Sequence, residues 1–414
     1  MVFFTTILGI ALGVGLSLIP GLHVNLGLTL LLSMGIEKVA GPLPTACMLA
    51  AAAGASLYMH RLSTVYHPAA GGGEIATLDH TLRFTAVGRG PDALRILQKA
   101  SDLAWVPFAG LTFIFMFCYA GHLNLAKALD VGLGFLGIPL IIIWGIYTCS
   151  RSKNPLMTLL GFFAVGMFGY VTLHHPAMRG NEHALAPIMT GLFGIPIMLT
   201  VLGERSNGLQ PQHLSKTIAI NPFLGLIGGG LGAATGFFAG LGTSSVAGLA
   251  GTICEDDNDY LMLVGSSEAT NNIFSILLVL LAGMGRSGEA VLIGRVAPFT
   301  ELNFMAILTI LGALAIGAYI GRSLMLRLED WYIETIGSKP QSMWALLVIG
   351  LGLFQVLLTG HIIIGLGLTA CGVALSMWCR SSKLPLQVSF SALAFPLIIQ
   401  QMGLVPFVNG ILFW

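Results

Sequence analysis

The 414-residue chain is too apolar for an ordinary soluble domain, because 55% of its residues are hydrophobic and only 9% are charged. Its formal net charge of +1 argues against a nucleic-acid-binding surface, and its six cysteines lack the spacing of a metal or redox site. The composition predicts a multi-pass protein of the cell membrane, in contact with membrane lipids.

Apolar runs long enough to enter or cross a bilayer predict an all-α fold with about 10–12 membrane segments. Several runs are interrupted by Gly or Pro, where a plain spanning helix would be smooth. The first set covers 2–35, 43–60, 104–120, 131–149, 156–173 and 184–202, and the second covers 218–254, 258–283, 288–321, 343–360, 361–378 and 385–414.

The first run carries no charge between Ile10 and Met34, yet a Pro-Gly break and two polar residues lie at its centre. Broken backbone at membrane depth needs protein or a water-filled cavity to satisfy its N–H and C=O groups, so we expect a re-entrant hairpin near 10–35. Half-helix N-termini and free N–H groups suit an anion, whereas carbonyls and hydroxyls suit Na⁺. A histidine satisfied by nearby backbone is the alternative for His23. The predicted substrate-binding residues here are Gly21, Leu22, His23 and Asn25.

The second half begins in the same way, with a glycine-rich hairpin near 218–254 whose break falls at residues 239–242. Hydroxyl groups follow this break directly. Glycines at every fourth position from Gly232 to Gly240 predict close helix packing within the chain, with a homodimer face as the alternative. The predicted substrate-binding residues of this hairpin are Gly242, Thr243, Ser244 and Ser245.

A second broken element is expected in each half, near 62–80 and near 283–299, because their Gly-Glu segments align at nearly the same offset. The matched elements predict two repeats, 1–204 and 205–414. Basic residues place the start of the span at 104–120 on the inner side of the membrane. They place the end of its counterpart, at Gly321, on that same side. The repeats are therefore predicted to be inverted. The acidic run 255–259 is expected to be a solvated loop that caps the next helix.

Polar residues inside the run at 258–283 form a stripe at helical spacing: Glu268, Asn271, Asn272 and Ser275. A carboxylate in a membrane helix needs a partner, a proton or a cation. We therefore assign Glu268, Asn271 and Asn272, with Glu74 of the first half, to a coupling-ion or proton site. The alternative is a structural hydrogen-bond cluster between helices.

Arg286 lies in the glycine-rich fourth element, beside Ser287, and both are predicted to bind the substrate. A guanidinium can clamp a carboxylate or phosphate through two hydrogen bonds. An exposed ion pair between Arg286 and Glu289 is the alternative. The sequence contains no Walker loop, zinc signature or nucleophile elbow, so we expect no cofactor other than Na⁺ or H⁺ as the coupling ion.

With these residues in view, the chain resembles the large permease subunit of the tripartite tricarboxylate transporter family. The similarity lies in Pro20-Gly21-Leu22, in Ala76-Thr77-Leu78-Asp79 with the basic loop after it, and above all in Glu268-Ala269-Thr270-Asn271-Asn272. It implies an ion-coupled permease for a small organic anion, working with a small membrane subunit and an extracytoplasmic binding protein.

The chain departs from the family pattern at Ala239, His23 and Arg286, where the family has proline, glycine and glycine. Its Pro-Gly break also looks like that of polyprenyl-phosphate translocases, for which a lipid phosphate would be the partner. That function remains the first alternative. An intramembrane lipid-modifying enzyme is the second, although no activated nucleophile or metal cluster is visible in the sequence.

Overall fold

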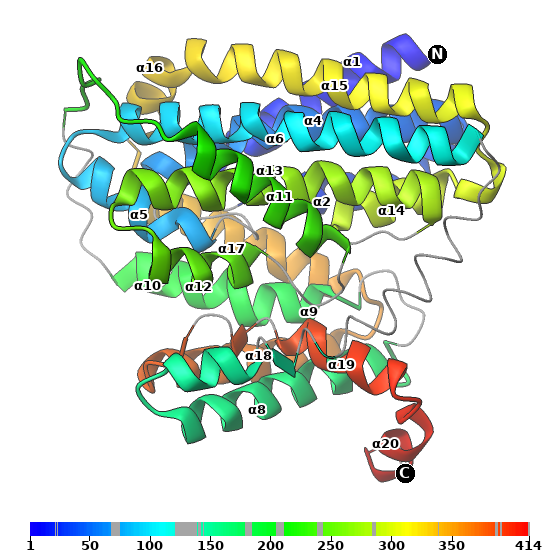
Figure 1. Cartoon of the computed structure of the whole chain (residues 1–414). Helices are drawn as coiled ribbons and strands as arrows, with labels where there is room; N and C mark the ends of the chain where they lie inside the picture. Colours follow the sequence, from blue (N-terminus) through cyan, green and yellow to red (C-terminus); the bar gives the residue numbers. More distant parts are fainter. Residues whose placement is uncertain are drawn as a thin grey trace. The chain divides into compact units, whose positions relative to one another are not determined.

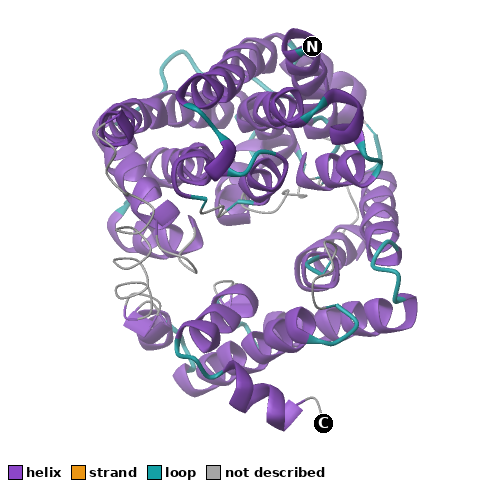
Figure 2. Ribbon diagram, turned by 90° about the vertical axis from the view of Figure 1, so that its right-hand side faces the viewer, coloured by secondary structure: helices purple, strands orange, loops and turns teal. Residues whose placement is uncertain are grey.

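The computed structural model describes residues 1–20, 22, 24–67, 75–120, 139, 142–143, 145–178, 184–203, 211–237, 243–283, 287–337, 339–385, 388–389 and 391–412. Within these ranges the chain forms helices and no strand (Figure 1, Figure 2), so the all-α prediction is confirmed. Five of the described helices are long and apolar enough to span a membrane: α4 (Pro42–Tyr66), α8 (Pro155–His174), α13 (Asp257–Ala282), α15 (Phe304–Arg327) and α18 (Ile362–Ser381).

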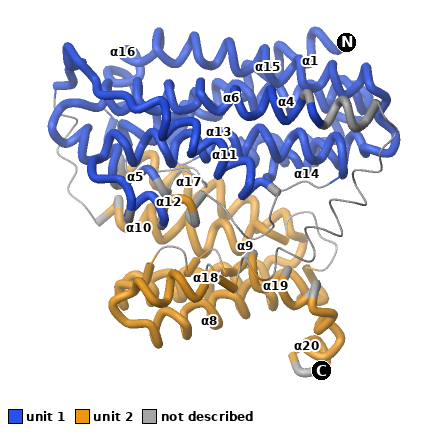
Figure 3. The backbone as a smooth tube through the Cα atoms, viewed as in Figure 1, with its two compact units in different colours: residues 1–130, 206–237, 249–340 blue, residues 131–205, 238–248, 341–414 orange. Residues whose placement is uncertain are grey.

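The chain divides into two compact units (Figure 3), and each takes segments from both predicted repeats. The first unit contains Met1–Asp130, Ser206–Phe237 and Leu249–Pro340. The second contains Val131–Arg205, Phe238–Gly248 and Gln341–Trp414. The units are thus different from the repeats 1–204 and 205–414, whose boundaries stay a prediction.

The first unit is built around the long helices α4 and α13, both of which are buried along most of their length. Shorter or more peripheral helices complete it: α1 (Val2–Ser17), α2 (Val24–Ser33), α3 (Ile36–Ala40), α5 (Ile75–Ala86), α6 (Gly90–Ala120), α11 (Pro222–Phe237), α14 (Gly288–Val296), η3 (Phe299–Glu301), α16 (Glu329–Tyr332) and η4 (Ile333–Gly337). Helix α12 (Thr243–Ile253) is divided between the units.

The two central helices have matching neighbours. Helix α4 packs against α1 and α15, and helix α13 packs against α11 and α6. In the predicted repeats α1 corresponds to α11 and α6 corresponds to α15. Each central helix therefore packs on the first helix of its own repeat and on the helix of the other repeat that corresponds to α6 or α15, which is consistent with the repeat prediction.

Glycines let the first helix of each half approach its central helix closely. A Cβ atom on Gly13 of α1 would overlap the carbonyl oxygen of Ala52, and one on Gly232 of α11 would overlap that of Ser267. The residue four positions earlier in each helix is also a glycine with the same restriction: Gly9 and Gly228. Small residues at this spacing allow helices to pack tightly in lipid. The hydrophobic effect does not drive helix association there, so van der Waals contacts stabilise the pair instead.

At each predicted interruption the structure describes separate helices on the two sides, and residues 238–242 of the second hairpin lie outside the described ranges. Helix α1 ends at Ser17 before α2 begins, and α11 ends at Phe237 before α12 begins. Likewise α4 ends before α5, and α13 ends before α14. The tips at Gly21 and Gly242 lie outside the described residues, so their approach near the membrane midplane stays a prediction.

Side chains at helix ends satisfy the first free N–H groups. The acidic run caps α13, as expected: the Asp256 side chain accepts a hydrogen bond from the Asp259 amide at 2.8 Å. Asn303 caps α15 in the same way, accepting from the amide of Ala306 at 2.9 Å. At its other end α13 stops at Gly283, whose φ of 71° favours glycine.

Contacts between loop-side residues agree with the predicted orientation of the two halves. The Nη1 of Arg95, near the start of α6, lies 2.9 Å from the Oε2 of Glu329, just beyond the end of α15. The start of α6 and the end of its counterpart α15 are therefore at the same end of the unit. Such an arrangement is expected if the two repeats are inverted.

Asp92, in the first turn of α6, hydrogen-bonds to the connection between the halves. The Ser215 amide and hydroxyl donate to its two carboxylate oxygens at 2.8 and 2.6 Å, and the Arg89 Nε donates at 2.7 Å. Burial alone would raise the pKa of Asp92, but these hydrogen bonds and the Arg89 charge outweigh burial and lower it below the ordinary value of 3.8.

The second unit contains α8 and α18 with shorter helices around them: α9 (Ala186–Ile188), η2 (Met189–Gly194), α10 (Ile195–Gly203), α17 (Gln341–Leu357), α19 (Ser391–Gln401) and α20 (Val405–Leu412). Helix α8 packs against α19, where a Cβ on Gly169 would overlap the backbone of Ala392. The Tyr170 hydroxyl lies 3.0 Å from the Asn409 Oδ1. Close glycine packing is therefore common to both units.

The glycine contacts predict a sharp difference between two positions of α11. Gly232→Ala should lower the free energy of unfolding by about 1–3 kcal/mol, because the added methyl group forces α11 away from α13. Gly230→Ala should not, since a Cβ there meets no atom within 4 Å. Thermal unfolding of the purified variants in detergent compares them, and equal stability would contradict the close approach.

The Asp92 contacts predict a pH-dependent loss of stability. Asp92→Asn should lower the unfolding free energy at pH 7 by about 1–3 kcal/mol, the cost of losing charged hydrogen bonds. A lowered folded pKa stabilises the fold above the unfolded pKa and stops doing so as the pH falls through the folded value. The melting-temperature difference from wild type should therefore shrink below about pH 4. Asp330→Asn, at an exposed position, is the control; a difference constant with pH would contradict this account.

Candidate functional site

Glu268, the carboxylate predicted to lie at membrane depth, forms an ion pair with Arg61 of α4. The Arg61 Nη1 lies 2.7 Å from the Glu268 Oε2, and the Arg61 Nη2 donates to the carbonyl oxygen of Gly265 at 3.4 Å. Both side chains are buried, with exposed fractions of 0% and 3%. A charge in a membrane domain needs such a partner. The ion pair therefore ties α4 to α13.

Sequence reasoning missed Arg61 because the apolar run was ended one residue before it. The helix continues for another turn and a half, to Tyr66, and its last residues are buried. Their hydroxyl groups do not interrupt it, since Thr64 donates to the carbonyl oxygen of His60 within the helix. A helix that extends to Tyr66 places Arg61 inside the bundle, within reach of Glu268.

The polar stripe on α13 does not form a single site. Asn271 lies beside Gly236 of α11, whereas Asn272 lines a pocket on the α4 side. The Ser275 hydroxyl accepts a hydrogen bond at 2.7 Å from the amide of Ser287, just before α14. Residues on one helix face therefore contact different neighbouring helices. Their common face does not by itself indicate that they bind one ligand.

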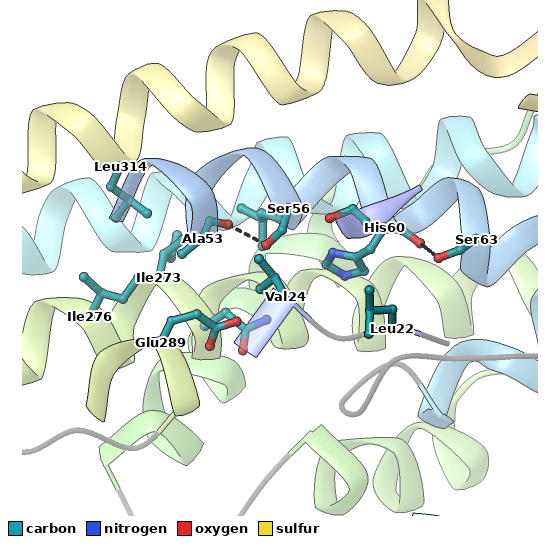
Figure 4. Close-up of a pocket in the computed structure, with 13 residues that line it drawn as sticks. Leu22, Val24, Ala53, Ser56, His60, Ser63, Ile273, Ile276, Glu289 and Leu314 are labelled. Carbon is teal, nitrogen blue, oxygen red and sulfur yellow. Dashed lines mark hydrogen bonds between the residues drawn. The ribbon is translucent and has the colours of Figure 1, made fainter. Parts of the chain in front are cut away.

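The pocket lies where the break between α1 and α2 meets α4, α13 and α14 (Figure 4). Figure 4 shows the imidazole of His60 and the carboxylate of Glu289 directed into it from α4 and α14. Its polar lining consists of Ser17, Ser56, His60, Ser63, Asn272 and Glu289, and the remaining lining is aliphatic.

The first hairpin forms one wall of the pocket. Ser17 is the last residue of α1, and Leu22 and Val24 lie on the far side of the break. Leu22, a predicted substrate-binding residue, therefore lines the pocket. Asn25, in the first turn of α2, lies against the start of α14, because a Cβ on Gly288 would overlap its side chain. The N-termini of α2 and α14 thus meet beside the same pocket.

The pocket is small. The volume available to water is about 30 Å³. One water needs roughly 10–15 Å³ by this measure, so there is room for about two. A proton or a small cation fits this space, whereas a tricarboxylate requires the walls to move.

The pocket serines use their hydrogens within their own helices. Ser17 donates to the Gly13 carbonyl oxygen at 2.6 Å, and Ser63 donates to the His60 carbonyl oxygen at 2.8 Å. Each hydroxyl oxygen keeps acceptor capacity for a group in the pocket. Within the described ranges, no three His, Cys, Asp or Glu side chains are grouped as a metal site.

Glu289 lies in the first turn of α14 and is 7% exposed. Ser287 caps this helix, because its hydroxyl oxygen accepts from the amide of Ala290 at 3.3 Å. Its role in substrate binding stays a prediction. A carboxylate at a helix N-terminus is favoured by the helix dipole.

Sequence reasoning also missed the α4 side of the pocket. Ser56, His60 and Ser63 are spaced i, i+4 and i+7, so they share one face of an otherwise apolar helix. The same spacing rule that singled out the stripe at Glu268 would have found them.

Several predicted site residues are not placed by the structure. Thr243, Ser244 and Ser245 form the first turn of α12, but their side chains are outside the described part of the chain. Their roles, and the coupling role of Glu268, stay predictions. The residues that lie wholly outside the described ranges are Gly21, His23, Glu74, Gly242 and Arg286.

The ion pair predicts strong non-additivity between Arg61 and Glu268. Glu268→Met should lower the unfolding free energy by about 3–5 kcal/mol, because it leaves a guanidinium buried without its counter-charge. The double variant Arg61→Met/Glu268→Met should recover most of this loss, since no buried charge remains. Denaturation in detergent measures both, and additive losses would contradict a direct pair.

Transport by the double variant then tests the coupling role of Glu268. A purely structural pair predicts that a folded double variant transports as wild type does at every pH. Loss of pH-dependent transport in a folded double variant indicates that the carboxylate itself takes part.

A family model described as "Tripartite tricarboxylate transporter TctA family" matches residues 3–390. Among curated proteins, an uncharacterized protein of Methanocaldococcus jannaschii, MJ1079, is 24% identical over 278 residues. The match covers 63% of this chain and 66% of that protein, just under two thirds of its length. No solved structure matches the chain significantly.

Proposed function

Because the chain belongs to the tripartite tricarboxylate transporter TctA family, we propose that it is an ion-coupled permease for a small organic anion such as a di- or tricarboxylate. The family is one of membrane transporters, and the chain is accordingly a multi-pass membrane protein. The anion, the coupling ion and the partners are the parts of this proposal that need experiment.

The main support is the polar pocket at the break between α1 and α2. Helices α2 and α14 both begin beside it, and Asn25 of the first contacts Gly288 of the second. Two helix N-termini present positive dipole ends, which favour an anion. Substrate sites at helix breaks between repeats are the usual design of secondary transporters.

Movement of the hairpin is part of the proposal. The pocket holds about two waters, so a di- or tricarboxylate must displace one or more of its walls. The break beside Leu22 and Val24 is where we expect this movement, because half-helices joined by broken backbone move with less disruption than one continuous helix. Such a motion would alternate the access of the site between the two sides of the membrane.

We further propose that the chain works with a small membrane subunit and an extracytoplasmic binding protein, as the family does. The binding protein would capture the anion and deliver it to the pocket. Co-purification of the chain with the products of neighbouring genes tests these partners independently of the substrate.

A binding and transport screen tests the function. Citrate and succinate should each raise the melting temperature of the purified protein if they bind the folded state. In proteoliposomes, labelled citrate or succinate should accumulate under a proton or sodium gradient. Stabilisation by a polyprenyl phosphate, without any by carboxylates, would support the lipid-carrier alternative and contradict the proposal.

A matched pair of variants locates the site. Asn272→Ala removes a pocket amide and should weaken citrate or succinate binding by about tenfold, the worth of one good hydrogen bond to a charged group. Asn258→Ala makes the same change on the same helix, 14 residues away, or roughly 21 Å along its axis. Equal affinities for the two variants would remove the pocket from the proposed site.

A further inference from the structure

Close glycine contacts show the direction in which the first helices run. Gly9 of α1 packs on Met48 of α4, and Gly13 of α1 packs on Ala52 of α4. The two helices advance together, so α1 runs parallel to α4 and begins at the same end of the unit. Two successive parallel helices require the chain to return between them. The segment that contains α2 makes this return.

Helix α15 runs in the same direction as α4, because Gly317 packs on Ala51 and Gly321 packs on Ala55. The basic residue at its end, Arg327, predicts that this end faces the inside of the cell. Helices α1, α4 and α15 therefore all begin at the opposite end of the unit, on the outer side of the membrane.

Helix α14 leads from the pocket to the outer end. Gly283, which ends α13, packs on the ring of Phe299 shortly before α15 begins, so α13 ends at the outer side. The amide just before α14 donates to the Ser275 hydroxyl of α13 at 2.7 Å, and Gly294 of α14 packs on Val279. Helix α14 thus runs outward alongside the last part of α13, and Figure 1 shows it at the end of the unit that carries the N-terminus.

Helix α2 leads the same way. Its first residue, Val24, lines the pocket (Figure 4), and its last residue, Ser33, is followed by α3 and by the start of α4 at Pro42. The pocket itself lies near the middle of α4 and α15, at Ala53 and Leu314. Helices α2 and α14 have 10 and 9 residues, so each is about 14–15 Å long, roughly half of the hydrocarbon core. These two short helices therefore cover the pocket on its outer side.

The two covering helices meet at Asn25 and Gly288, where a Cβ atom on Gly288 would overlap the Asn25 side chain. They are held differently. Helix α14 is tied to α13 by the backbone hydrogen bond to Ser275. Helix α2 rests on α1 through a side chain, because a Cβ on Gly27 would overlap Leu16. Side-chain contacts rearrange between rotamers without breaking backbone hydrogen bonds. Of the two covers, α2 is therefore the one that moves with less disruption.

We propose that α2 is the outer gate of the pocket, and that it admits the anion from the outer side of the membrane by parting Asn25 from Gly288. The inference rests on the proposed function and adds to it the moving helix and the side from which the pocket is filled. The closed pocket holds about two waters, so it has no room for a di- or tricarboxylate. The anion therefore shifts the equilibrium towards the open gate.

A disulfide across the gate tests its movement. A Cβ on Gly288 would lie 2.7 Å from the Asn25 Cγ. The two Cβ atoms are thus at most about 4.2 Å apart, within the range of a disulfide. In proteoliposomes, with the native cysteines replaced by alanine, oxidised Asn25→Cys/Gly288→Cys should lose nearly all uptake of citrate or succinate, and reduction should restore it.

The controls for the disulfide are the two single variants, Asn25→Cys and Gly288→Cys, treated with the same oxidant. Neither should respond to oxidation or reduction. Undiminished uptake by the fully cross-linked double variant would overturn the gate and leave the proposed function intact.

Thiol labelling tests the gate without any substrate. Ser56→Cys places a thiol in the pocket, and a membrane-impermeant maleimide should label it from the outer side of membrane vesicles. Gly288→Ala should speed this labelling several-fold, because the added methyl group pushes the Asn25 side chain and α2 away. The matched control is Gly312→Ala, since a Cβ at Gly312 meets no atom within 4 Å.

Two exposed positions mark the sides of the membrane in these vesicles. Glu301→Cys, before α15, should be labelled from the outer side, and Asp330→Cys, after α15, from the inner side. Absence of outer labelling at Ser56→Cys, or equal labelling rates with Gly288→Ala and Gly312→Ala, would overturn the gate. If the labelling follows the expected pattern but wild type transports no carboxylate, the proposed function fails while the gate stands.

Discussion

Charged and broken-backbone groups in the first unit must find their partners inside the protein, because lipid offers none. Arg61 and Glu268 meet this constraint by pairing across α4 and α13. Ser287 meets it by donating its amide to Ser275 where α14 is about to begin. The polar residues of α13 therefore contact different neighbouring helices. Several separate polar interactions hold the interior of the unit together.

The glycine contacts hold the first half of each hairpin against a central helix. Helix α1 is held against α4 along Gly9 and Gly13, and α11 is held against α13 along Gly228 and Gly232. The breaks follow soon afterwards, at Ser17 and Phe237. Each hairpin thus has a first half fixed by backbone contact and a second half that starts anew. A hairpin built this way can move its second half without releasing the core.

The sequence predicted the helical class and the membrane location, since these depend on local hydrophobicity. It could not predict which side chains meet. Arg61 lies 207 residues before Glu268, and His60 and Glu289 line one pocket that only three-dimensional packing forms. The stripe at Glu268 was recognisable by its spacing, but the spacing did not reveal that Asn271 and Asn272 have different neighbours.

His60 and Arg61 are successive residues of α4, yet they take part in two different sites: one lines the pocket and the other holds α13. Successive side chains on an α-helix point about 100° apart, and a buried helix turns or slides as a rigid body. A small rotation of α4 that reshapes the pocket would therefore also strain the ion pair between Arg61 and Glu268 of α13. A change in the pocket that rotated α4 would in this way also change the contact between α4 and α13.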